Sequence, residues 1–283
     1  MRKELRVTTN LGRVTVRQGG PETGPPIIFI PGLTLNAADW PRSLLRHLDG
    51  LGYRTLALDL PDSAHSDRVA VDYSADRFCE AVKDAIEALQ LEAFHLVGMS
   101  LGGLILQRME LPVGRVLSTT FLMSCACTYP LSLKSSQSVG KLMTVPLNIS
   151  KEVAFFHCLA CREYLAGTAN EHELRELRDR VYRSVERAWP YGSSPHRQMR
   201  VAMEILGGSR PDFTRWTHPT LIIHGENDPL LPLWSARSLH KQIAGSRMEI
   251  VPGMGHELLE RYSEQIGHCF SEFLAGKRQS QAC

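Results

Sequence analysis

Three segments of the chain carry side chains that could perform nucleophilic chemistry together. The first, Gly98-Met-Ser100-Leu-Gly102-Gly103, holds a serine between glycines. In a G-x-S-x-G pattern the glycines allow a sharp strand-to-helix turn, which lifts the serine oxygen above a sheet. A serine hydroxyl is a weak nucleophile, so it needs a base within hydrogen-bond reach and a third group that orients that base. Ser100 is therefore the candidate nucleophile, although the motif alone also fits a helix N-cap.

Two later segments could supply the base and the orienting group. Asp228 stands in a turn just after the apolar run Leu221–His224, and His256 stands in the glycine-rich loop Gly253–His256. Aspartate before proline is common in ordinary turns, and a single loop histidine is often a surface residue. The order serine, aspartate, histidine is nevertheless the one expected when a G-x-S-x-G turn provides the nucleophile. We expect His256 to be the base and Asp228 to orient it.

The elements that must position these residues alternate between strand and helix patterns. After an antiparallel pair within Leu5–Arg17, strands are predicted at Ile27–Ile30, Arg54–Leu60, Ala93–Gly98, Val116–Cys125, Thr220–His224 and Arg247–Val251. Helices are predicted at Ala37–Leu51, Ser74–Leu91, Leu101–Leu111, Trp234–Ile243 and Glu257–Leu274, with Gly276 ending the last. This alternation predicts an α/β fold with a mostly parallel central sheet of about eight strands, flanked by helices.

A long segment without strand pattern interrupts the alternation after the sixth predicted strand. Lys151–Leu165 and Glu171–Trp189 instead place apolar residues at helical spacing. We therefore predict a helical cap at residues 129–213, inserted into a core formed by residues 1–128 and 214–283.

The composition excludes several classes of protein. Apolar residues make up 43% and charged residues 22% of the 283 residues, as in globular proteins. The formal net charge of +2 gives no concentrated field for nucleic acid or an anionic membrane. The apolar runs fall short of the ~18 residues of a membrane span, and the N-terminus lacks a signal-peptide pattern. We expect a small-molecule partner, no nucleic acid, no stable membrane insertion and a cytoplasmic location, with the oligomeric state left open.

The cysteines and motifs suggest no cofactor and no metal. The seven cysteines are scattered and odd in number, so reduced thiols are expected. Cys158 and Cys161 form a C-x-x-C within a predicted helix, where buried cysteines usually act as small hydrophobes. Histidine and carboxylate spacing typical of metal sites is missing from the sequence, as are glycine-rich nucleotide motifs. His95 and His224 are interpreted as structural residues.

With these motifs, the chain resembles the α/β-hydrolase superfamily, within its group of capped serine hydrolases and esterases. The resemblance spans nearly the whole chain outside the cap. It is carried by Ile30-Pro-Gly32-Leu33, Leu58-Asp59-Leu-Pro61, Gly98–Gly103, His224–Asp228 and Gly253–His256. It implies that the backbone N–H groups of Leu33 and Leu101 form an oxyanion hole.

The sequence departs from the family pattern in three places. Pro31 stands where many members have histidine, and the stretch Asp62-Ser-Ala-His65 lacks the glycines usual there. The turn Glu110–Arg115 is slightly compressed. We expect the second loop to differ in shape, with Asp59 bracing it and His65 facing solvent, while a direct role for either stays open.

The resemblance implies a serine hydrolase that cleaves a carboxylic ester, lactone or thioester of a small, largely apolar substrate through an acyl-enzyme on Ser100. The same residues could serve C–C bond hydrolysis, perhydrolysis, or biosynthetic acyl transfer or cyclisation. A ligand-binding receptor would keep the fold without the chemistry. The cap is expected to decide which acyl group is accepted.

Overall fold

The centre of the molecule is one eight-stranded sheet with the strand order β1-β2-β4-β3-β5-β6-β7-β8. The computed structural model describes residues 3–126, 148–209 and 211–281. The strands are β1 (Lys3–Thr9), β2 (Gly12–Gly19), β3 (Pro26–Ile30), β4 (Arg54–Leu58), β5 (Phe94–Met99), β6 (Val116–Leu122), β7 (Thr220–Gly225) and β8 (Arg247–Val251). β2 runs antiparallel to β1 and β4, and the remaining neighbouring pairs are parallel. The predicted mostly parallel sheet is confirmed.

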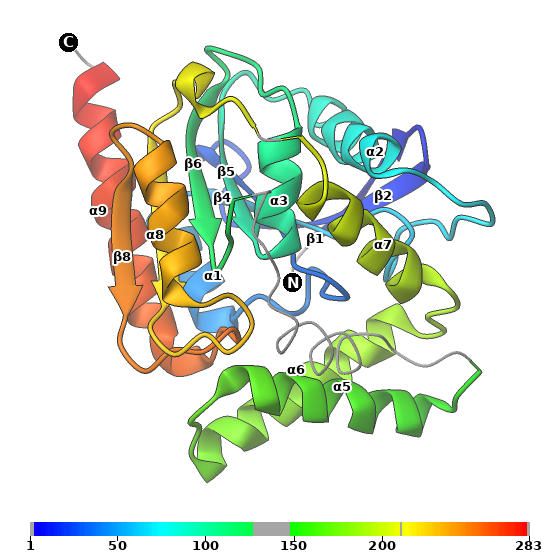
Figure 1. Cartoon of the computed structure of the whole chain (residues 1–283). Coiled ribbons are helices and arrows are strands. Elements are labelled where there is room, and N and C mark those ends of the chain that lie inside the picture. The colour runs from blue at the N-terminus through cyan, green and yellow to red at the C-terminus, as the bar shows by residue number, and fades with distance from the viewer. Residues whose placement is uncertain (1–2, 127–147, 210, 282–283) are drawn as a thin grey trace.

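Helices cover both faces of this sheet (Figure 1). α2 (Ala75–Glu87), α3 (Leu101–Arg108) and α8 (Leu233–Gln242) lie on one face, and α1 (Arg42–Gly50) and α9 (Ser263–Gln281) lie on the other. Because both faces are covered, β5 is buried along its whole length, which explains its continuous apolar sequence.

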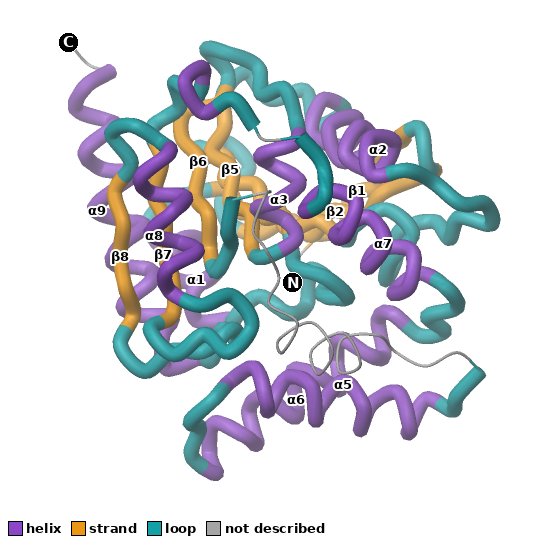
Figure 2. Tube along the Cα trace, in the orientation of Figure 1, coloured by secondary structure: helices purple, strands orange, loops and turns teal. Residues whose placement is uncertain are grey.

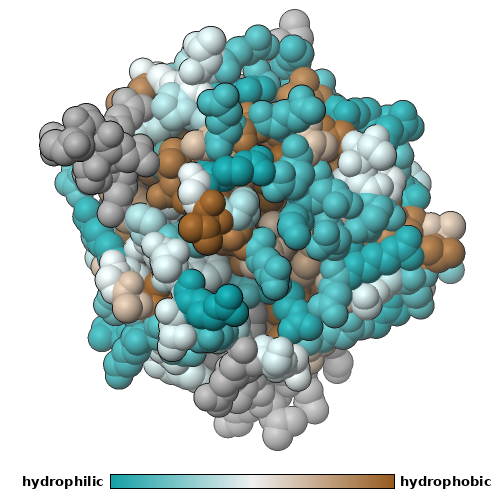
Figure 3. All heavy atoms as spheres, turned by 90° about the horizontal axis from the view of Figure 1, so that it is seen from above, coloured by the Kyte–Doolittle hydropathy of each residue, from teal (hydrophilic) through white to brown (hydrophobic). Residues whose placement is uncertain are grey.

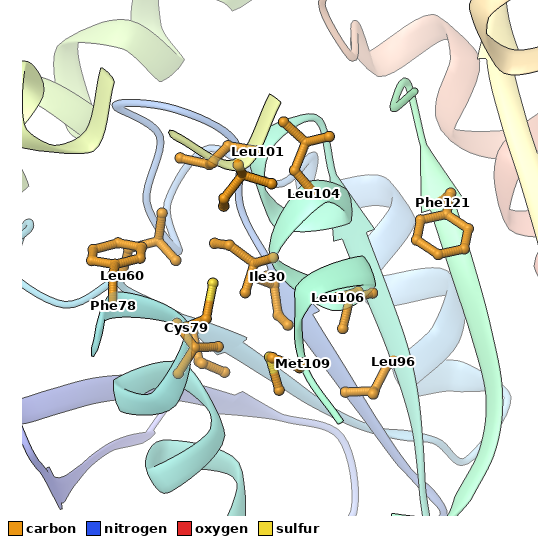
Figure 4. Close-up of a cluster of buried hydrophobic side chains, with 14 of the residues drawn as sticks. Ile30, Leu60, Phe78, Cys79, Leu96, Leu101, Leu104, Leu106, Met109 and Phe121 are labelled. Atoms are coloured by element: carbon orange, nitrogen blue, oxygen red, sulfur yellow. The ribbon is translucent and has the colours of Figure 1, made fainter. Parts of the chain in front are cut away.

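Two hydrophobic cores hold these layers together. On one face, Phe78 of α2 and Leu104 of α3 pack toward Ile30 and Leu96 of the sheet, as Figure 4 shows. On the other face, helices α1 and α9 pack against Phe29 of β3. Each fully buried leucine or phenylalanine contributes about 1.5–3 kcal/mol relative to an exposed one. The strands that precede the candidate site are thus fixed from both sides.

Two predicted helices begin well after the expected residue in the structure. The helix expected at Ala37–Leu51 begins only at Arg42, because residues 36–39 form a hydrogen-bonded turn and Pro41 disfavours helical backbone at Trp40. The helix expected at Glu257–Leu274 begins at Ser263, after the short 3₁₀ helix η2 (Glu260–Tyr262), and continues past Gly276 to Gln281. A glycine costs a helix only about 1 kcal/mol relative to alanine, so it does not have to end one.

In the described part of the segment between β6 and β7 there are three α-helices: α5 (Lys151–Ala166), α6 (Glu171–Ala188) and α7 (Ser194–Leu206). A further 3₁₀ helix, η1 (Phe213–Arg215), leads into β7. We call α5, α6 and α7 the inserted helices. α5 and α6 lie together beyond the strand ends, whereas α7 packs on α2 and α3 (Figures 1 and 2). The cap boundaries 129–213 stay a prediction, and residues 129–147 and 210 lie outside the described residues.

Sequence features explain where the inserted helices begin. Ser150 caps α5 by accepting a hydrogen bond from the backbone N–H of Val153. Asn170 and Glu173 form a reciprocal capping box at the start of α6. Such caps stabilise a helix by about 1 kcal/mol, so the local sequence specifies where both helices begin.

Hydrophilic residues dominate the face of the molecule seen from above in Figure 3, and hydrophobic residues appear there in small groups. Within the described ranges, every helix is either too short or too polar to cross a lipid bilayer.

Candidate active site

Ser100 stands at the sharp turn between β5 and α3 predicted from the sequence. Its backbone has φ 50° and ψ −114°, a left-handed region that non-glycine residues rarely adopt. Two hydrogen bonds hold this conformation: the N–H of Ser100 donates to the carbonyl of Leu122, and the hydroxyl of Ser124 donates to the carbonyl of Ser100. The neighbouring strand β6 thus fixes the strained turn from outside.

Glycines allow other backbone segments to approach this turn closely. A Cβ atom added at Gly98 would lie 2.6 Å from the carbonyl oxygen of Gly102, and one added at Gly102 would lie 2.2 Å from that of Ile30. Both distances are far below van der Waals contact, so only glycine fits. The loop after β3, which carries Leu33, is thereby brought against the start of α3.

The structure brings the three predicted side chains together. His256 Nε2 lies 3.0 Å from Ser100 Oγ, and His256 Nδ1 lies 2.6 Å from Asp228 Oδ2. His256 and Asp228 are buried, whereas Ser100 is partly exposed. Nε2 is therefore close enough to accept a proton from Ser100, and Nδ1 is close enough to be oriented by Asp228.

The Asp228 carboxylate is held by its own turn. Its second oxygen, Oδ1, accepts hydrogen bonds from the backbone N–H groups of Leu230 and Leu231 at 2.9 and 2.7 Å. His224 Nε2 lies 2.7 Å from the carbonyl oxygen of Leu231 and 3.5 Å from Asp228 Oδ2. Burial is the main cause that lowers the pKa of His224, so this imidazole stays neutral. His224 therefore supports the turn that carries Asp228, which fits the interpretation of His224 as a structural residue.

Leu33 and Leu101 have the environment expected of oxyanion-hole residues. Their side chains are buried in one hydrophobic core, which fixes the backbone at both positions (Figure 4 shows Leu101). In the part of the chain that the structure describes, neither backbone N–H donates a hydrogen bond to another residue. Leu101 is also the first residue of α3, where free N–H groups favour negative charge.

A cavity of about 50 Å³ lies over Ser100. Leu35 lines one side of it, and Leu165 of α5 and Val181 and Val185 of α6 line the side formed by the inserted helices. Polar groups are also present in its wall, from His157, Cys158, Arg162, Ser184 and Tyr191. The inserted helices α5 and α6 thus form one wall of a small, partly open and largely apolar cavity at the candidate nucleophile.

The C-x-x-C cysteines lie at this cavity rather than at a metal site. Cys158 Sγ lies 3.8 Å from the Tyr191 hydroxyl, and Cys161 Sγ lies 3.8 Å from His157 Nε2. Burial raises the pKa of both thiols, that of Cys161 to about 12, and it also raises the pKa of Tyr191. The two thiols and the Tyr191 hydroxyl are therefore neutral near pH 7 and line the cavity as uncharged groups. Among the described residues, no group of three histidines, cysteines or carboxylates is placed to hold a metal ion.

Asp59 and His65 lie outside the cavity. Asp59 is fully buried and accepts hydrogen bonds from the N–H groups of Ala37 and His65 and from the guanidinium of Arg187 on α6. It braces its loop, as predicted. His65 lies at the surface beside Glu4, 3.1 Å from that carboxylate.

The loop without glycines keeps backbone conformations that glycines usually supply. Asp62 and Ala64 have φ 60° and 48°. The buried Asp62 carboxylate accepts hydrogen bonds from the backbone N–H of Val69, the Tyr73 hydroxyl and Arg197 of α7. These contacts hold a conformation that would otherwise be unfavourable.

Sequence reasoning missed a group of buried charges beside the candidate site. Arg162 of α5 and Arg180 of α6 both bind Glu257, which directly follows His256, and Arg162 also binds Asp39. The sequence signal was weak, because an arginine on an amphipathic helix usually faces solvent.

Comparison with known proteins identifies the family of the chain. The family model for the alpha/beta hydrolase fold matches residues 25–261. A rhodomycin D methylesterase of Streptomyces sp. (strain C5) is 28% identical over 267 residues, which cover 84% of this chain and 87% of the relative. A non-heme chloroperoxidase of Kitasatospora aureofaciens is 26% identical over 248 residues, which cover 82% and 85%.

Solved structures show the same fold. A meta-cleavage product hydrolase from Pseudomonas fluorescens IP01 superposes with a TM-score of 0.76 at 20% identity, over 96% of this chain and 97% of that one. The family match, the sheet order and the strand-turn-helix around Ser100 lead to one conclusion. This chain belongs to the α/β-hydrolase fold family.

Proposed function

We propose that the protein is a serine hydrolase that cleaves carboxylic esters of small, largely apolar substrates through an acyl-enzyme on Ser100. The observation that carries this proposal is the continuous chain from Ser100 through His256 to Asp228, with separations of 3.0 and 2.6 Å, at a cavity lined by Ser100 and His256. The similarity to a methylesterase supports an ester as the substrate.

In the proposed reaction, His256 Nε2 accepts the Ser100 hydroxyl proton while Oγ attacks the ester carbonyl carbon. The N–H groups of Leu33 and Leu101 stabilise the negative oxygen of the tetrahedral intermediate. The imidazolium then gives its proton to the departing alcohol, which leaves an acyl-enzyme. Asp228 stabilises the imidazolium throughout, and a water activated by His256 releases the acid.

The cavity supports a short acyl group. A volume of about 50 Å³ holds only a few water molecules, since one water needs roughly 10–15 Å³ measured in this way. Its described wall carries aliphatic side chains, thiols and hydroxyls that are neutral near pH 7, and its charged residues Arg162 and Glu257 are paired with each other. We therefore propose a short, uncharged acyl chain as the group that Ser100 accepts.

The first test is Ser100→Ala, assayed on p-nitrophenyl esters. On the scale measured for catalytic triads, kcat should fall by up to roughly a millionfold. The control is Ser235→Ala, because the Ser235 hydroxyl on α8 is buried and has no hydrogen-bond partner among the described residues. That control should keep full activity. Full ester hydrolysis by Ser100→Ala would contradict the mechanism.

A substrate panel then separates ester cleavage from the other reactions that the same residues could perform. It comprises p-nitrophenyl esters of increasing acyl length, lactones and thioesters, with labelling by a fluorophosphonate as a separate readout. We expect labelling at Ser100 and the highest kcat/KM for a short acyl ester. A receptor of this fold would not label, and a transferase or cyclase would label without net hydrolysis.

A further inference from the structure

A buried group of four charged side chains joins the inserted helices to the loop that carries His256. Arg162 of α5 donates from Nε and Nη2 to the two oxygens of Glu257, both at 2.7 Å. Arg180 of α6 donates to Glu257 Oε1 at 2.7 Å and to the carbonyl oxygen of Leu258 at 2.6 Å. Arg162 Nη1 also donates to Asp39. We call Arg162, Arg180, Glu257 and Asp39 the charge cluster.

The cluster is buried and electrically balanced. Its side chains are only 3–8% exposed, and two guanidiniums face two carboxylates. Burial alone would raise the pKa of Glu257, but Arg162 and Arg180 outweigh it and keep that pKa below its usual value. A buried ion pair of this kind often contributes little net stability compared with apolar packing, whereas losing one partner is costly. We therefore expect the charge cluster to matter for how it positions the segments that it joins more than for its contribution to the free energy of unfolding.

The cluster reaches the candidate base through adjoining backbone. Glu257 is the residue after His256, and the backbone N–H of His256 donates to the carbonyl oxygen of Leu165 in the last turn of α5 at 2.7 Å. A Cβ atom added at Gly255 would lie 2.3 Å from that same oxygen, so the loop and α5 are as close as a glycine permits. Helix α5 thus holds His256 by one backbone bond and by the bidentate contact of Arg162 with the next residue.

The cluster also reaches the loop that carries Leu33. Asp39 Oδ2 accepts hydrogen bonds from the backbone N–H of Asn36 at 2.8 Å and from the hydroxyl of Ser184 on α6 at 2.7 Å. The Asn36 amide donates back to that hydroxyl at 2.8 Å. Leu33 lies three residues before Asn36. One set of contacts therefore spans both loops that would have to be aligned over Ser100.

We propose that Arg162 and Glu257 are positioning residues that set His256, and through Asp39 the Leu33 loop, relative to Ser100. In this arrangement the inserted helices take part in aligning the reacting groups in addition to enclosing the substrate. The inference rests on the proposed serine hydrolase function. Arg162 lines the cavity, but its guanidinium is engaged by two carboxylates of the protein, so it acts through them rather than on the substrate.

The test uses Arg162→Lys, which keeps the charge but removes the bidentate fork. Its matched control is Arg197→Lys, since Arg197 also joins an inserted helix to a buried core carboxylate, Asp62, at 2.7 Å, yet lies outside the cavity. For both variants we would measure thermal unfolding, kcat and KM on the best p-nitrophenyl ester, and the rate of phosphonylation by a small fluorophosphonate.

We expect Arg162→Lys to lower kcat and the phosphonylation rate by roughly 10- to 100-fold with little change in KM. A displacement of the reacting groups by about 1 Å is enough to lower a rate by roughly 100-fold. Arg197→Lys should lower the unfolding temperature by a similar amount and leave both rates within about twofold of wild type. Equal kcat values and equal phosphonylation rates in the two variants would overturn the proposal. The charge cluster would then only attach α5 and α6 to the core.

A second variant keeps the test decisive if Arg162→Lys does not fold. Arg162→Met combined with Asp39→Asn removes one cation and one anion, so Arg180 and Glu257 remain as a contacting pair at 2.7 Å. It should fold and show the same selective loss of kcat and phosphonylation rate, whereas wild-type rates in this folded variant would overturn the proposal. Failure of the proposed function itself would appear differently, as absent labelling of the wild-type protein at Ser100.

Discussion

At the scale of single residues, the candidate site depends on atoms that are each held by more than one contact. Ser100 keeps a left-handed backbone that costs a non-glycine residue about 1–2 kcal/mol, and Leu122 of β6 and Ser124 just after it hold it there through one hydrogen bond each. Asp228 uses one carboxylate oxygen for His256 and the other for two backbone N–H groups. The hydrogen bond from His256 to Asp228 is thus directed to one oxygen only.

Asp228→Asn tests this division of roles. Asparagine has a similar shape but no negative charge, and its amide stabilises the wrong tautomer of the neighbouring imidazole. We expect kcat on an ester to fall by roughly 10⁴-fold while the fold is preserved. Asp67→Asn is the control, because Asp67 binds Arg6 and Arg13 at the sheet edge and should leave kcat unchanged. A loss of less than tenfold in Asp228→Asn would remove Asp228 from the mechanism.

At the scale of elements, α5 and α6 determine the size and lining of the cavity. Leu165, Val181 and Val185 line the cavity, whereas other apolar side chains of these helices are exposed to solvent, among them Val153, Phe156, Tyr164 and Tyr182. Val181 and Val185 are one helical turn apart on α6 and both line the cavity, as the four-residue spacing predicts. The acyl preference should therefore change when one of these side chains is shortened.

Val185→Ala removes two methyl groups from the cavity wall. The ratio of kcat/KM for a longer acyl ester to that for an acetyl ester should rise by about tenfold, since one or two methylenes of fit change discrimination by roughly 1–3 kcal/mol. Tyr182→Ala on the exposed side of α6 serves as the comparison and should leave the ratio unchanged. An unchanged ratio in Val185→Ala would mean that the acyl group does not bind against α6.

At the scale of the whole molecule, residues from the end of the chain complete structures near its beginning. Helix α1 has Pro41 at its N-cap position and no side-chain cap of its own. Glu260 supplies that cap from far along the chain by accepting hydrogen bonds from the N–H groups of Arg42 and Ser43 and from the Ser43 hydroxyl. The carboxylate also complements the positive end of the helix dipole.

Glu260→Gln should make the stability of the protein less dependent on pH. Burial raises the pKa of Glu260, but the hydrogen bonds from Ser43 and Arg42 outweigh it, so the pKa in the folded protein lies below the ordinary glutamate value of 4.5. A lowered carboxylate pKa stabilises the fold above the unfolded value, and this contribution is lost as the pH falls through the folded value. Wild type should exceed Glu260→Gln by about 1 kcal/mol near pH 7, with the difference shrinking below about pH 4.5.

Denaturant unfolding at a series of pH values from 7 to 3 measures this difference. Glu22→Gln is a suitable control, because Glu22 is an exposed carboxylate whose partners are the exposed Lys3 and the side-chain amide of Gln18. A difference between wild type and Glu260→Gln that stays constant over the whole pH range would contradict a role for the ionised carboxylate.

The sequence by itself determined the sheet, the strand that precedes each candidate residue and the positions of Ser100, Asp228 and His256. These features are local: apolar period, glycine spacing and turn residues specify them within a few neighbouring positions. The exact helix starts were less determined, since the starts of α1 and α9 depend on a loop turn and on the burial of Glu257. Neither signal is visible in the helical periodicity.

Only the tertiary structure decided the size of the cavity and the partners of Arg162. Arg162 and Glu257 are 95 positions apart, and both are types of residue that normally face solvent. Their pairing requires α5 to lie against the His256 loop, which depends on how the inserted helices pack rather than on any local pattern. Packing of distant segments leaves almost no periodic signal in the sequence, because a charged residue on a helix has the same local pattern whether it meets solvent or a buried partner.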